Sequence, residues 1–496
     1  MRFMKKTSVW ASRLAGWGLL TLLVLTVSAQ AAERRHGLTA CRLAGVPNEV
    51  WCGVVDRPLD SNRPQGKRIE VHFAVVPALA RNRKRDPVFF FAGGPGQSAI
   101  DLAGPVSRML SRVGYRRDLV FIDQRGTGRS APLRCPDDAP GRPLAEIAST
   151  EAAIAQLLVC REALQKLPHG DLRQYTTTQA VEDAEAVRVV LEADYVNVIG
   201  VSYGTRVALE YLRLKPQVVR RVVIDGVAPA DMALPVSVSA DNQAALDAEI
   251  KACAAEPRCR DRFPTLQADW QALLAGLPRA VSVAHPVTGV VEKVTFTRDA
   301  VLGMVRAPLY SPVLASALPQ AITDAARGRF EPLVGLSSVN AGNRRGQIAA
   351  GMHFSVVCSE DASHMAQSKD TPGADFGVSF AKVYKLVCAD WPTSPVADAF
   401  YTLPEAAAAT LLLSGGVDPV TPPRHGERVA AALGSRARHV VVPQAGHGVL
   451  AIACMRDAVL KFIDAVNDAE ALKVDVDCAR AVPRPSAFLS VSESPK

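Results

Sequence analysis

A serine, an aspartate and a histidine, far apart along the chain, each follow a short apolar segment. Ser202 lies in Gly-Val-Ser-Tyr-Gly at 200–204, directly after the apolar run 195–199 and before a helix-like stretch at 205–214. Glycines on both sides of the serine allow a strained turn between a strand and a helix, which exposes the hydroxyl. The segment predicts a nucleophile, although a chain of this length can contain Gly-x-Ser-x-Gly by chance.

Two later segments supply the groups that a serine nucleophile needs. A serine hydroxyl requires a base to take its proton and an acid to orient that base. Asp418 opens the loop after the apolar run 410–413, and His447 lies in the loop after 440–442. All three groups are therefore expected at the carboxyl ends of strands, where open α/β sheets place their sites. The alternatives, which lack this combination of position and chain order, are the acid Asp225 and the bases His425 and His439.

Backbone N–H groups near Ser202 could hold the negative oxygen of a tetrahedral intermediate. One donor is expected to be Tyr203, directly after the nucleophile. The other is expected to be Gly94, within Gly-Gly-Pro-Gly at 93–96 after the apolar run 89–91. A Gly-Pro turn without a catalytic role would explain the same residues when they are considered alone.

We expect no cofactor and no metal. The segment 126–128, Gly-Thr-Gly, lacks the further glycine of a dinucleotide site and the lysine of a P-loop, which favours a structural turn. A zinc site is the alternative for the cysteines, but the sequence contains neither Cys-x-x-Cys nor His-Glu-x-x-His.

The apolar segments imply a parallel sheet. Short, nearly continuous apolar runs at 87–91, 118–122, 196–199, 221–224, 410–413 and 440–442 are typical of strands buried on both faces. Helical patterns such as 178–192 separate most of them, which predicts α/β architecture. Before them, 53–78 alternates like paired strands, with 68–76 the clearest example.

The alternation stops between Ile224 and Thr410, where helical patterns at 241–255, 266–277 and 314–326 predominate. A hairpin is expected at 281–297, turning near Thr288-Gly289. This long interruption indicates an inserted, mainly helical cap. The expected divisions are 1–31 as a signal peptide, 32–230 and 404–496 as two parts of the core, and 231–403 as the cap. The proline-rich tail after Val482 is expected to be loosely ordered.

The amino terminus resembles an export signal. Four basic residues precede the uncharged apolar stretch 14–27, and Ala-Gln-Ala at 29–31 follows, so cleavage is expected after Ala31. A retained membrane anchor is the alternative, weakened by Gly16, Gly18, Ser28 and Gln30. We expect no stable membrane association after cleavage, in the periplasm or the medium. Removing 1–31 lowers the formal charge from +8 to about +4. Beyond the short basic run 81–85, which is typical of a solvated loop, no segment is dense in Lys or Arg, so nucleic-acid binding has little support.

Ten cysteines, an even number in an exported chain, indicate disulfides. They fall into neighbouring couples along the sequence, although the sequence does not fix their connectivity. The expected pairs are Cys41–Cys52, Cys135–Cys160, Cys253–Cys259, Cys358–Cys388 and Cys454–Cys478.

Four segments together resemble a known family. They are Gly-Gly-Pro-Gly at 93–96, Asp-Gln-Arg-Gly-Thr-Gly-Arg-Ser at 123–130, Gly-Val-Ser-Tyr-Gly-Thr at 200–205 and Asp-Pro-Val-Thr-Pro at 418–422. They are similar to the tripeptidyl aminopeptidase and proline iminopeptidase branch of the α/β hydrolases. Tyr203, where proline iminopeptidases usually have tryptophan, favours the tripeptidyl side. Ala92 replaces the histidine of proline iminopeptidases, so selectivity for proline does not carry over. The resemblance covers the catalytic core and about 358–478, but little of the cap.

The resemblance implies the α/β-hydrolase fold and an exported exopeptidase that cleaves peptides from the amino terminus. Such an enzyme must bind an ammonium group, for which carboxylates are suitable. Related peptidases carry an acidic motif after the cap, and Glu360, less firmly Asp361, occupies that position. Acids that cap a surface helix are the alternative. An esterase or lipase on the same scaffold, or a non-catalytic exported binding protein, remains a competing interpretation. The sequence does not indicate an oligomeric state.

Overall fold

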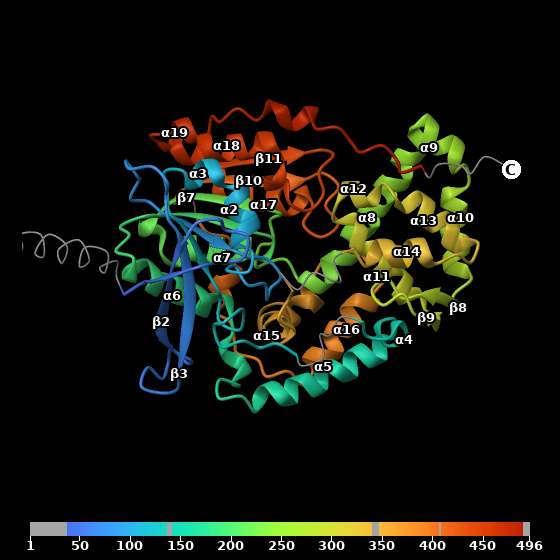
Figure 1. Ribbon diagram of the computed structural model, residues 1–496, viewed down its shortest axis with the longest axis horizontal. Coiled ribbons are helices and arrows are strands. Elements are labelled where there is room, and N and C mark those ends of the chain that lie inside the picture. Colours follow the sequence, from blue (N-terminus) through green and yellow to red (C-terminus); the bar gives the residue numbers. More distant parts are fainter. Residues whose placement is uncertain (1–36, 136–140, 340–346, 406–407, 490–496) are drawn as a thin grey trace, which may run out of the picture.

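A nine-stranded sheet forms the centre of the computed structural model, which describes residues 37–135, 141–339, 347–405 and 408–489 (Figure 1). The strand order is β1-β2-β3-β5-β4-β6-β7-β10-β11. The pairs from β5 to β11 are parallel, whereas β1, β2 and β3 add an antiparallel edge. The expected signal peptide lies outside the described residues.

The strands agree with the apolar runs of the sequence. They are β1 Thr39–Cys41, β2 Val50–Pro58, β3 Arg68–Val76, β4 Val88–Phe91, β5 Leu119–Ile122, β6 Val196–Val201, β7 Val219–Asp225, β10 Ala409–Gly415 and β11 Ala437–Val442. A separate hairpin consists of β8 Arg279–Ala284 and β9 Val291–Phe296.

The helices of the core are α2 Ala103–Met109, α3 Ser111–Gly114, α4 Leu144–Ile147, α5 Thr150–Gln165, α6 Thr177–Val190, α7 Tyr203–Leu214, α17 Pro423–Leu433, α18 Ala453–Asp464 and α19 Asp468–Ala471. Between β7 and β10 lie α8 Leu234–Ala255, α9 Pro257–Arg262, α10 Leu266–Ala275, α11 Arg298–Leu309, α12 Pro312–Ala315, α13 Leu318–Ala326, α14 Glu331–Ser337, α15 Ala350–Glu360 and α16 Ser379–Cys388.

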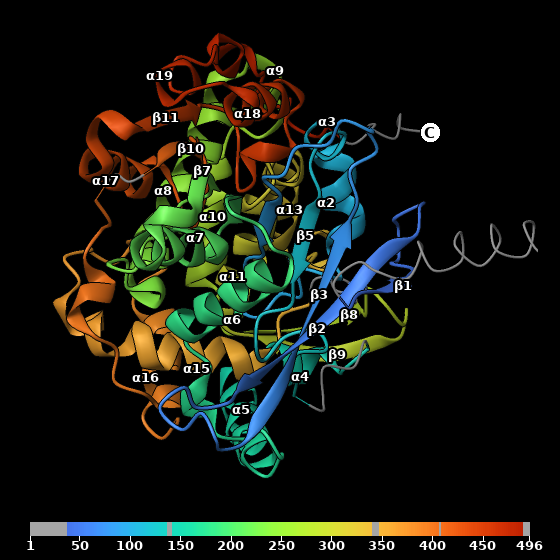
Figure 2. The same cartoon turned by 90° about the vertical axis from the view of Figure 1, so that its left-hand side faces the viewer.

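Helices cover both faces of the sheet, as continuous apolar strands require. On one face α6, α7 and α17 contribute buried residues such as Val181, Val207 and Val429 to a single apolar cluster. Figure 2 shows α6 and α7 in front of the strands. On the other face α2, α3 and α18 pack in a second cluster that includes Val106 and Phe462. The predicted α/β-hydrolase architecture, a mostly parallel sheet between helices, is confirmed.

The cap has an apolar cluster of its own, built around Trp270, Leu318 and Phe330. It also receives Leu144 of α4, which comes from the first part of the core. Conversely, the stretch from Ala349 to Trp391 contributes to the cluster beneath α6 and α7. Residues of the core therefore pack in the cluster of the cap, and residues of the cap pack in a cluster of the core. The boundaries of the cap at 231 and 403 stay a prediction.

Two local expectations differ from the structure. The single helix expected at 314–326 is divided into α12 and α13, because Pro319 stands in the first turn of α13 and favours a helix start there. The described part of the tail, 483–489, is not loose: Arg484 pairs with Glu249, and the Phe488 N–H donates to the Ser316 carbonyl at 2.9 Å. In Figure 1 this tail runs from the core to the cap.

All ten cysteines are paired, each with its neighbour along the chain. The bonds join the same couples that the sequence suggested: Cys41–Cys52, Cys135–Cys160, Cys253–Cys259, Cys358–Cys388 and Cys454–Cys478. Cys358–Cys388 ties the end of α15 to the end of α16.

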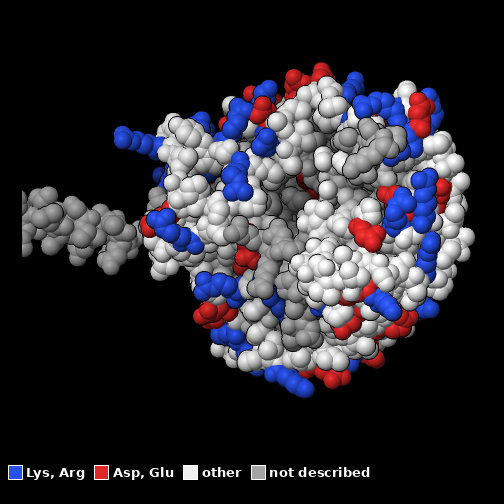
Figure 3. All heavy atoms as spheres, turned by 45° about the vertical axis from the view of Figure 1, so that its right-hand side comes forward, with Lys and Arg blue, Asp and Glu red and all other residues white. Residues whose placement is uncertain are grey.

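Charges of both signs are interspersed on the face shown in Figure 3, where a hollow also opens. Among the residues that the structure describes, no helix is long and apolar enough to cross a membrane.

Candidate active site

Ser202 forms the turn between β6 and α7. Its backbone, with φ of 56° and ψ of −126°, occupies a region that residues other than glycine rarely adopt. A Cβ at Gly200 would lie 2.2 Å from the Gly204 carbonyl oxygen, and one at Gly204 would lie 2.1 Å from the Phe91 carbonyl oxygen. Strand, turn and helix can therefore approach this closely only because both flanking residues are glycines, and the serine has the strained geometry of an exposed nucleophile.

Asp418 and His447 form a hydrogen-bonded pair. The His447 Nδ1–H donates to Asp418 Oδ2 at 2.8 Å. The Thr421 hydroxyl donates to the same oxygen at 2.7 Å, while the Val420 and Thr421 N–H groups both donate to Oδ1 at 2.9 Å. The Asp418 side chain is fully enclosed, whereas His447 remains 14% exposed. This arrangement fixes the tautomer of His447 and leaves Nε2 as the proton acceptor.

The pair stabilises the charged form of each partner. Burial alone lowers the pKa of His447, but the Asp418 carboxylate outweighs burial and holds this pKa above its ordinary value. Burial raises the pKa of Asp418, but His447 and the N–H donors of the loop keep it below its ordinary value. An imidazolium beside an ionised carboxylate is the state that forms once a histidine has taken a serine proton.

Asp225, at the end of β7, connects the two halves of the site. Its carbonyl accepts the Ser202 N–H at 2.8 Å. Its buried carboxylate accepts the N–H groups of Val449 at 3.0 Å and Leu450 at 2.7 Å, just beyond His447. A Cβ on the next residue, Gly226, would lie 3.1 Å from His447 Cε1. Ser202 and His447 thus approach the same short segment, and Asp225 positions both instead of acting as the acid.

The two alternative bases have other partners. His425 Nε2 lies 3.1 Å from Asp241 Oδ2, and His439 Nε2 lies 3.0 Å from the Ser414 hydroxyl. Neither pair includes Ser202 or Asp418. In the part of the chain that the structure describes, there is also no group of three or more His, Cys, Asp or Glu suited to a metal ion.

The Gly-rich loop after β4 lies directly against the nucleophile. A Cβ built on Gly93 would lie 3.1 Å from Ser202 Cβ, and Gly94 has φ of +112°, which favours glycine. Tyr203 is the first residue of α7, where N–H groups have no acceptor within the helix. The N–H groups of Gly94 and Tyr203 therefore stay the predicted oxyanion donors.

A cap residue, Tyr310, contacts the base. Its carbonyl accepts the His447 N–H at 2.9 Å, and its ring meets the imidazole edge-on with centroids 5.3 Å apart. Tyr310 directly follows α11, so this helix helps to orient His447. Gly446 makes the contact possible, because a Cβ there would lie 2.5 Å from the Tyr310 carbonyl oxygen.

The loop 123–130 braces the site rather than contributing to it. Asp123 Oδ1 accepts the Ser98 hydroxyl at 2.6 Å and the Ile100 N–H at 3.1 Å, which holds the chain that follows 93–96. Arg125 is fully buried and donates to both carboxylate oxygens of Asp183 in α6, at 2.7 and 2.8 Å. These contacts support the structural turn predicted for this segment.

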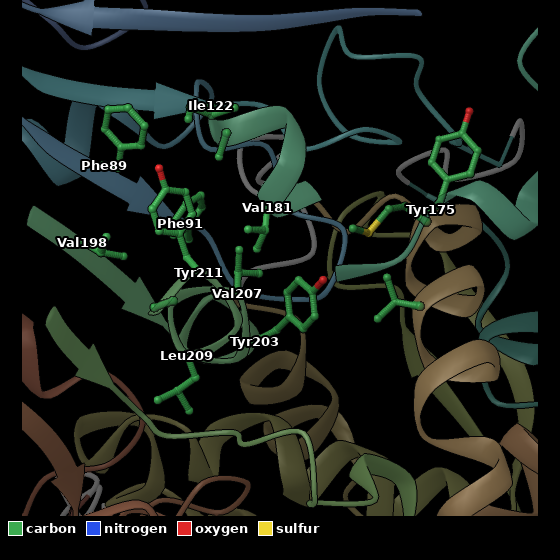
Figure 4. Close-up of a cluster of buried hydrophobic side chains, with 14 of the residues drawn as sticks. Phe89, Phe91, Ile122, Tyr175, Val181, Val198, Tyr203, Val207, Leu209 and Tyr211 are labelled. Carbon is green, nitrogen blue, oxygen red and sulfur yellow. The ribbon is translucent and has the colours of Figure 1, made fainter. Parts of the chain in front are cut away.

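Glu360 and Asp361 lie behind the nucleophile in a buried network. Glu360 accepts the Thr177 N–H at 2.6 Å and the Thr177 hydroxyl at 2.9 Å. Because Thr177 donates its hydrogen to Glu360, the Tyr203 hydroxyl must donate to Thr177, 2.7 Å away. Arg206 pairs with both Asp361 oxygens at 2.9 Å. Figure 4 shows the Tyr203 ring near Val181 and Val207.

Both carboxylates are only 1% exposed. Burial raises the pKa of Glu360 to about 7 against the opposing charge of Arg206. Binding a substrate ammonium at either carboxylate would require displacing a protein donor. Both residues remain a prediction for recognition of the amino terminus, while their visible role is to fix Tyr203 and α7.

The sequence assigned no role to Thr421 or Tyr310, and it offered Asp225 only as an alternative acid, not as a residue that positions Ser202 and His447. Thr421 could have been found, since an aspartate followed three residues later by threonine favours a side-chain-stabilised turn. Tyr310 has no local signal, because its contact with His447 joins residues 137 positions apart in the printed sequence.

Known proteins resemble this chain over most of its length. Residues 86–249 match the alpha/beta hydrolase fold family, and residues 374–470 match the TAP-like protein family. The serine protease Hip1 of Mycobacterium tuberculosis is 26% identical, with 86% of this chain and 89% of that protein aligned. The tripeptidyl aminopeptidase of Streptomyces lividans is also 26% identical, with 89% of this chain and 86% of that protein aligned.

The second family match begins near the end of the cap and contains both Asp418 and His447, whereas the first contains Ser202. The two matches therefore cover the nucleophile and its partners separately, in agreement with the interrupted sheet. The chain has the α/β-hydrolase fold, its carboxyl-terminal segment is similar to TAP-like proteins, and it is a serine hydrolase.

Proposed function

We propose that the protein is an exported serine peptidase that releases short peptides from a free amino terminus. The observation that carries the proposal is the Asp418–His447 pair beside the strained Ser202 turn, in a chain whose aligned relatives are a serine protease and a tripeptidyl aminopeptidase. A peptide is accordingly the proposed substrate, and the reaction is hydrolysis without a cofactor.

The proposed reaction proceeds through an acyl-enzyme. His447 takes the Ser202 proton as the serine oxygen attacks the scissile carbonyl, and Asp418 stabilises the resulting imidazolium. The Gly94 and Tyr203 N–H groups hold the negative oxygen. His447 returns the proton to the leaving amine as the peptide bond breaks. Water, deprotonated by His447, then attacks the ester on Ser202, and breakage of that ester restores the hydroxyl.

The test is a substrate panel with wild-type enzyme and S202A. Peptide anilides with free amino termini should be hydrolysed faster than acetylated peptides or short-chain esters. S202A should lose activity by about 10³-fold or more without a change in thermal stability. A fluorophosphonate probe should label the wild type only. Strong ester turnover with no preference for a free amino terminus would indicate an esterase, and an unlabelled wild type would indicate a binding protein.

Recognition of the amino terminus by Glu360, with Asp361 in support, is part of the proposal. E360Q should raise KM for free-amino peptides but not for acetylated ones. If Glu360 instead only fixes Tyr203, kcat should fall equally for both classes of peptide. D361N serves as the comparison, because it removes the charge of one of the two carboxylates paired with Arg206 while leaving the Thr177 contacts of Glu360 intact.

Export is proposed from the sequence of 1–31 and agrees with the five disulfides, which persist in oxidising compartments. Secretion in a bacterial host followed by amino-terminal sequencing should identify Ala32 as the first residue of the mature chain. A mature chain that still begins at Met1 and fractionates with membranes would instead indicate the retained anchor.

A further inference from the structure

Arg306, in α11, places a positive charge in a cavity of the cap. The cavity, about 150 Å³, is bounded by α8, α11 and α16. The guanidinium carbon lies 4.6 Å from the centroid of the Phe380 ring. Within 37–135, 141–339, 347–405 and 408–489, Arg306 has neither an ion pair nor a hydrogen bond.

This differs from other arginines that the fold encloses. Arg125 is paired with Asp183, Arg206 with Asp361, and Arg424 with Asp241. Partly enclosed charges are costly unless they are paired, so a guanidinium with only an aromatic contact is unusual. A carboxylate on a bound ligand would supply the ion-pair partner that Arg306 lacks among the described residues.

Arg306 lies beside the proposed catalytic machinery. Tyr310 is one helical turn further along the chain, and its carbonyl holds the His447 N–H. Arg306 also acts on His353 of α15. Burial lowers the pKa of His353 to about 4, and the positive charge of Arg306 contributes to this decrease. The His353 Nδ1–H contacts the Pro95 carbonyl at 3.2 Å, within the loop predicted to hold the oxyanion.

The cavity has room for a ligand next to the guanidinium. Gly303 lies one turn before Arg306, and a Cβ there would meet no atom within 4 Å. Gly303 and Asp299 also line a neighbouring cavity of about 670 Å³, together with Ile348. Ile348 in turn packs on Gly96, since a Cβ there would lie 3.0 Å from the Ile348 side chain. The larger cavity therefore reaches a residue, Ile348, that packs on the loop 93–96.

Asp299 does not serve as the missing partner. It lies two helical turns from Arg306, about 10 Å along the axis of α11. The side of α11 that lines the cavity thus carries the Asp299 carboxylate at one end and the Arg306 guanidinium at the other, with open space at Gly303 between them. The Arg306 end is the one nearer in sequence to Tyr310, which contacts His447.

We propose that Arg306, stacked on Phe380, is a subsite for a carboxylate of the peptide substrate. A guanidinium presents two parallel N–H donors that match a carboxylate, which a lysine ammonium cannot reproduce. This inference rests on the proposed peptidase function and adds a preference for peptides with an acidic group near the scissile bond. The carboxylate is either that of an Asp or Glu side chain or that of the carboxyl terminus of a short peptide.

The experiment compares kcat/KM for matched peptides with Glu or Gln on either side of the scissile bond, and with a terminal acid or amide. The wild type should favour the charged member of a pair by about 10-fold or more, as a charge-assisted hydrogen bond predicts. R306M should abolish the preference, R306K should retain part of it, and R306E should favour Lys over Glu. The control is R258E, at an exposed position of α9. It changes the net charge by the same amount as R306E and should keep the wild-type ratio of kcat/KM between the charged and uncharged peptides.

The outcomes distinguish the two sources of the carboxylate, and they distinguish failure of the subsite from failure of the proposed peptidase function. Dependence on Arg306 in the Glu/Gln pairs alone identifies a side-chain carboxylate, and dependence in the acid/amide pair alone identifies the terminal one. R306M that keeps the wild-type ratios, with an unchanged melting temperature, would overturn the subsite. If the wild type cleaves no peptide, the peptidase proposal fails. The subsite is then tested with aryl esters of glutarate and butyrate, and equal effects of R306M on both would refute it.

Discussion

Each member of the proposed triad is held by a neighbour to which the sequence motifs assign no catalytic role. Thr421 fixes the Asp418 carboxylate, Tyr310 holds the His447 backbone, and the Asp225 carbonyl holds the Ser202 N–H. The Ser-Asp-His order could be predicted because each group follows an apolar strand in the sequence. Of their neighbours, Thr421 could be predicted from its position three residues after Asp418, whereas the contacts of Tyr310 and Asp225 could not, because they depend on packing between segments that are distant along the chain.

The charge on Asp418 should determine the pH at which activity is lost. His447 acts as a base only when neutral, and its raised pKa predicts that activity falls as the pH drops through a value above the ordinary one for histidine. D418N should reduce kcat/KM by about 10³- to 10⁴-fold and move the acidic limb to lower pH. The measurement is the pH profile of kcat/KM with a peptide anilide.

The chain offers a matched control for this prediction. D241N disrupts a second buried His–Asp pair, His425 with Asp241, which does not contact the triad. Its acidic limb should coincide with that of the wild type. An unmoved limb in D418N would mean that Asp418 does not set the pKa of His447.

Glu360 should make stability depend on pH. Its pKa in the folded chain is about 7, above its ordinary value of 4.5, so protonation favours the folded state. The stabilisation is complete below the unfolded pKa and is lost as the pH rises through about 7. Because Gln resembles the neutral acid, the melting temperature of E360Q should decline less than that of the wild type between about pH 5 and pH 8. E331Q, at an exposed position of α14, should follow the wild-type profile, and an E360Q profile parallel to both would contradict this account.

At the scale of elements, the close approach of α7 to β4 is the contact on which the site depends. The sequence predicted both elements from an apolar run and a helical pattern, and their glycines indicated a tight turn. It did not indicate that Pro319 would divide the helix expected at 314–326, since proline within a helical pattern can either kink a helix or begin one.

Gly204 tests this contact directly. G204A should destabilise the protein by about 1–3 kcal/mol or more, because its methyl group would meet the Phe91 carbonyl at 2.1 Å and α7 would have to move. Activity should fall together with stability, since the same shift displaces Tyr203 and Ser202. G335A is the control, in α14, where a Cβ meets no atom within 4 Å, and it should be neutral or slightly stabilising. Thermal denaturation of both variants distinguishes a close contact from a general effect of alanine.

At the scale of the whole molecule, core and cap are joined by several crossings, that is, segments of one part that pack against the other. The core segment at Leu144 packs into the cap, the stretch from Ala349 to Trp391 packs under the core, and the tail reaches α8 through Arg484. Alternating strands and helices in the sequence were sufficient to predict the core. The crossings were not predictable, because an apolar residue such as Leu144 does not reveal which cluster it enters.

Truncation of the tail tests the last crossing. A chain that ends at Val482 loses the Arg484–Glu249 pair, the Phe488–Ser316 hydrogen bond and the packing of Ala487 and Leu489 on the cap. Its melting temperature should fall by several degrees, and hydrogen exchange should increase in α8 and α12 more than in the sheet. A chain that ends at Leu489 retains these contacts and should match the full-length protein. Equal exchange in both truncations would show that the tail does not stabilise the cap.

The position of this tail has a consequence for biosynthesis. Residues 484–489 are synthesised after every helix of the cap, yet they contribute to the packing of the cap. During synthesis the cap therefore lacks these contacts until residues 484–489 have left the ribosome. Termination of synthesis before residue 484 would leave every residue of the proposed triad in place but the cap without its contacts to the tail.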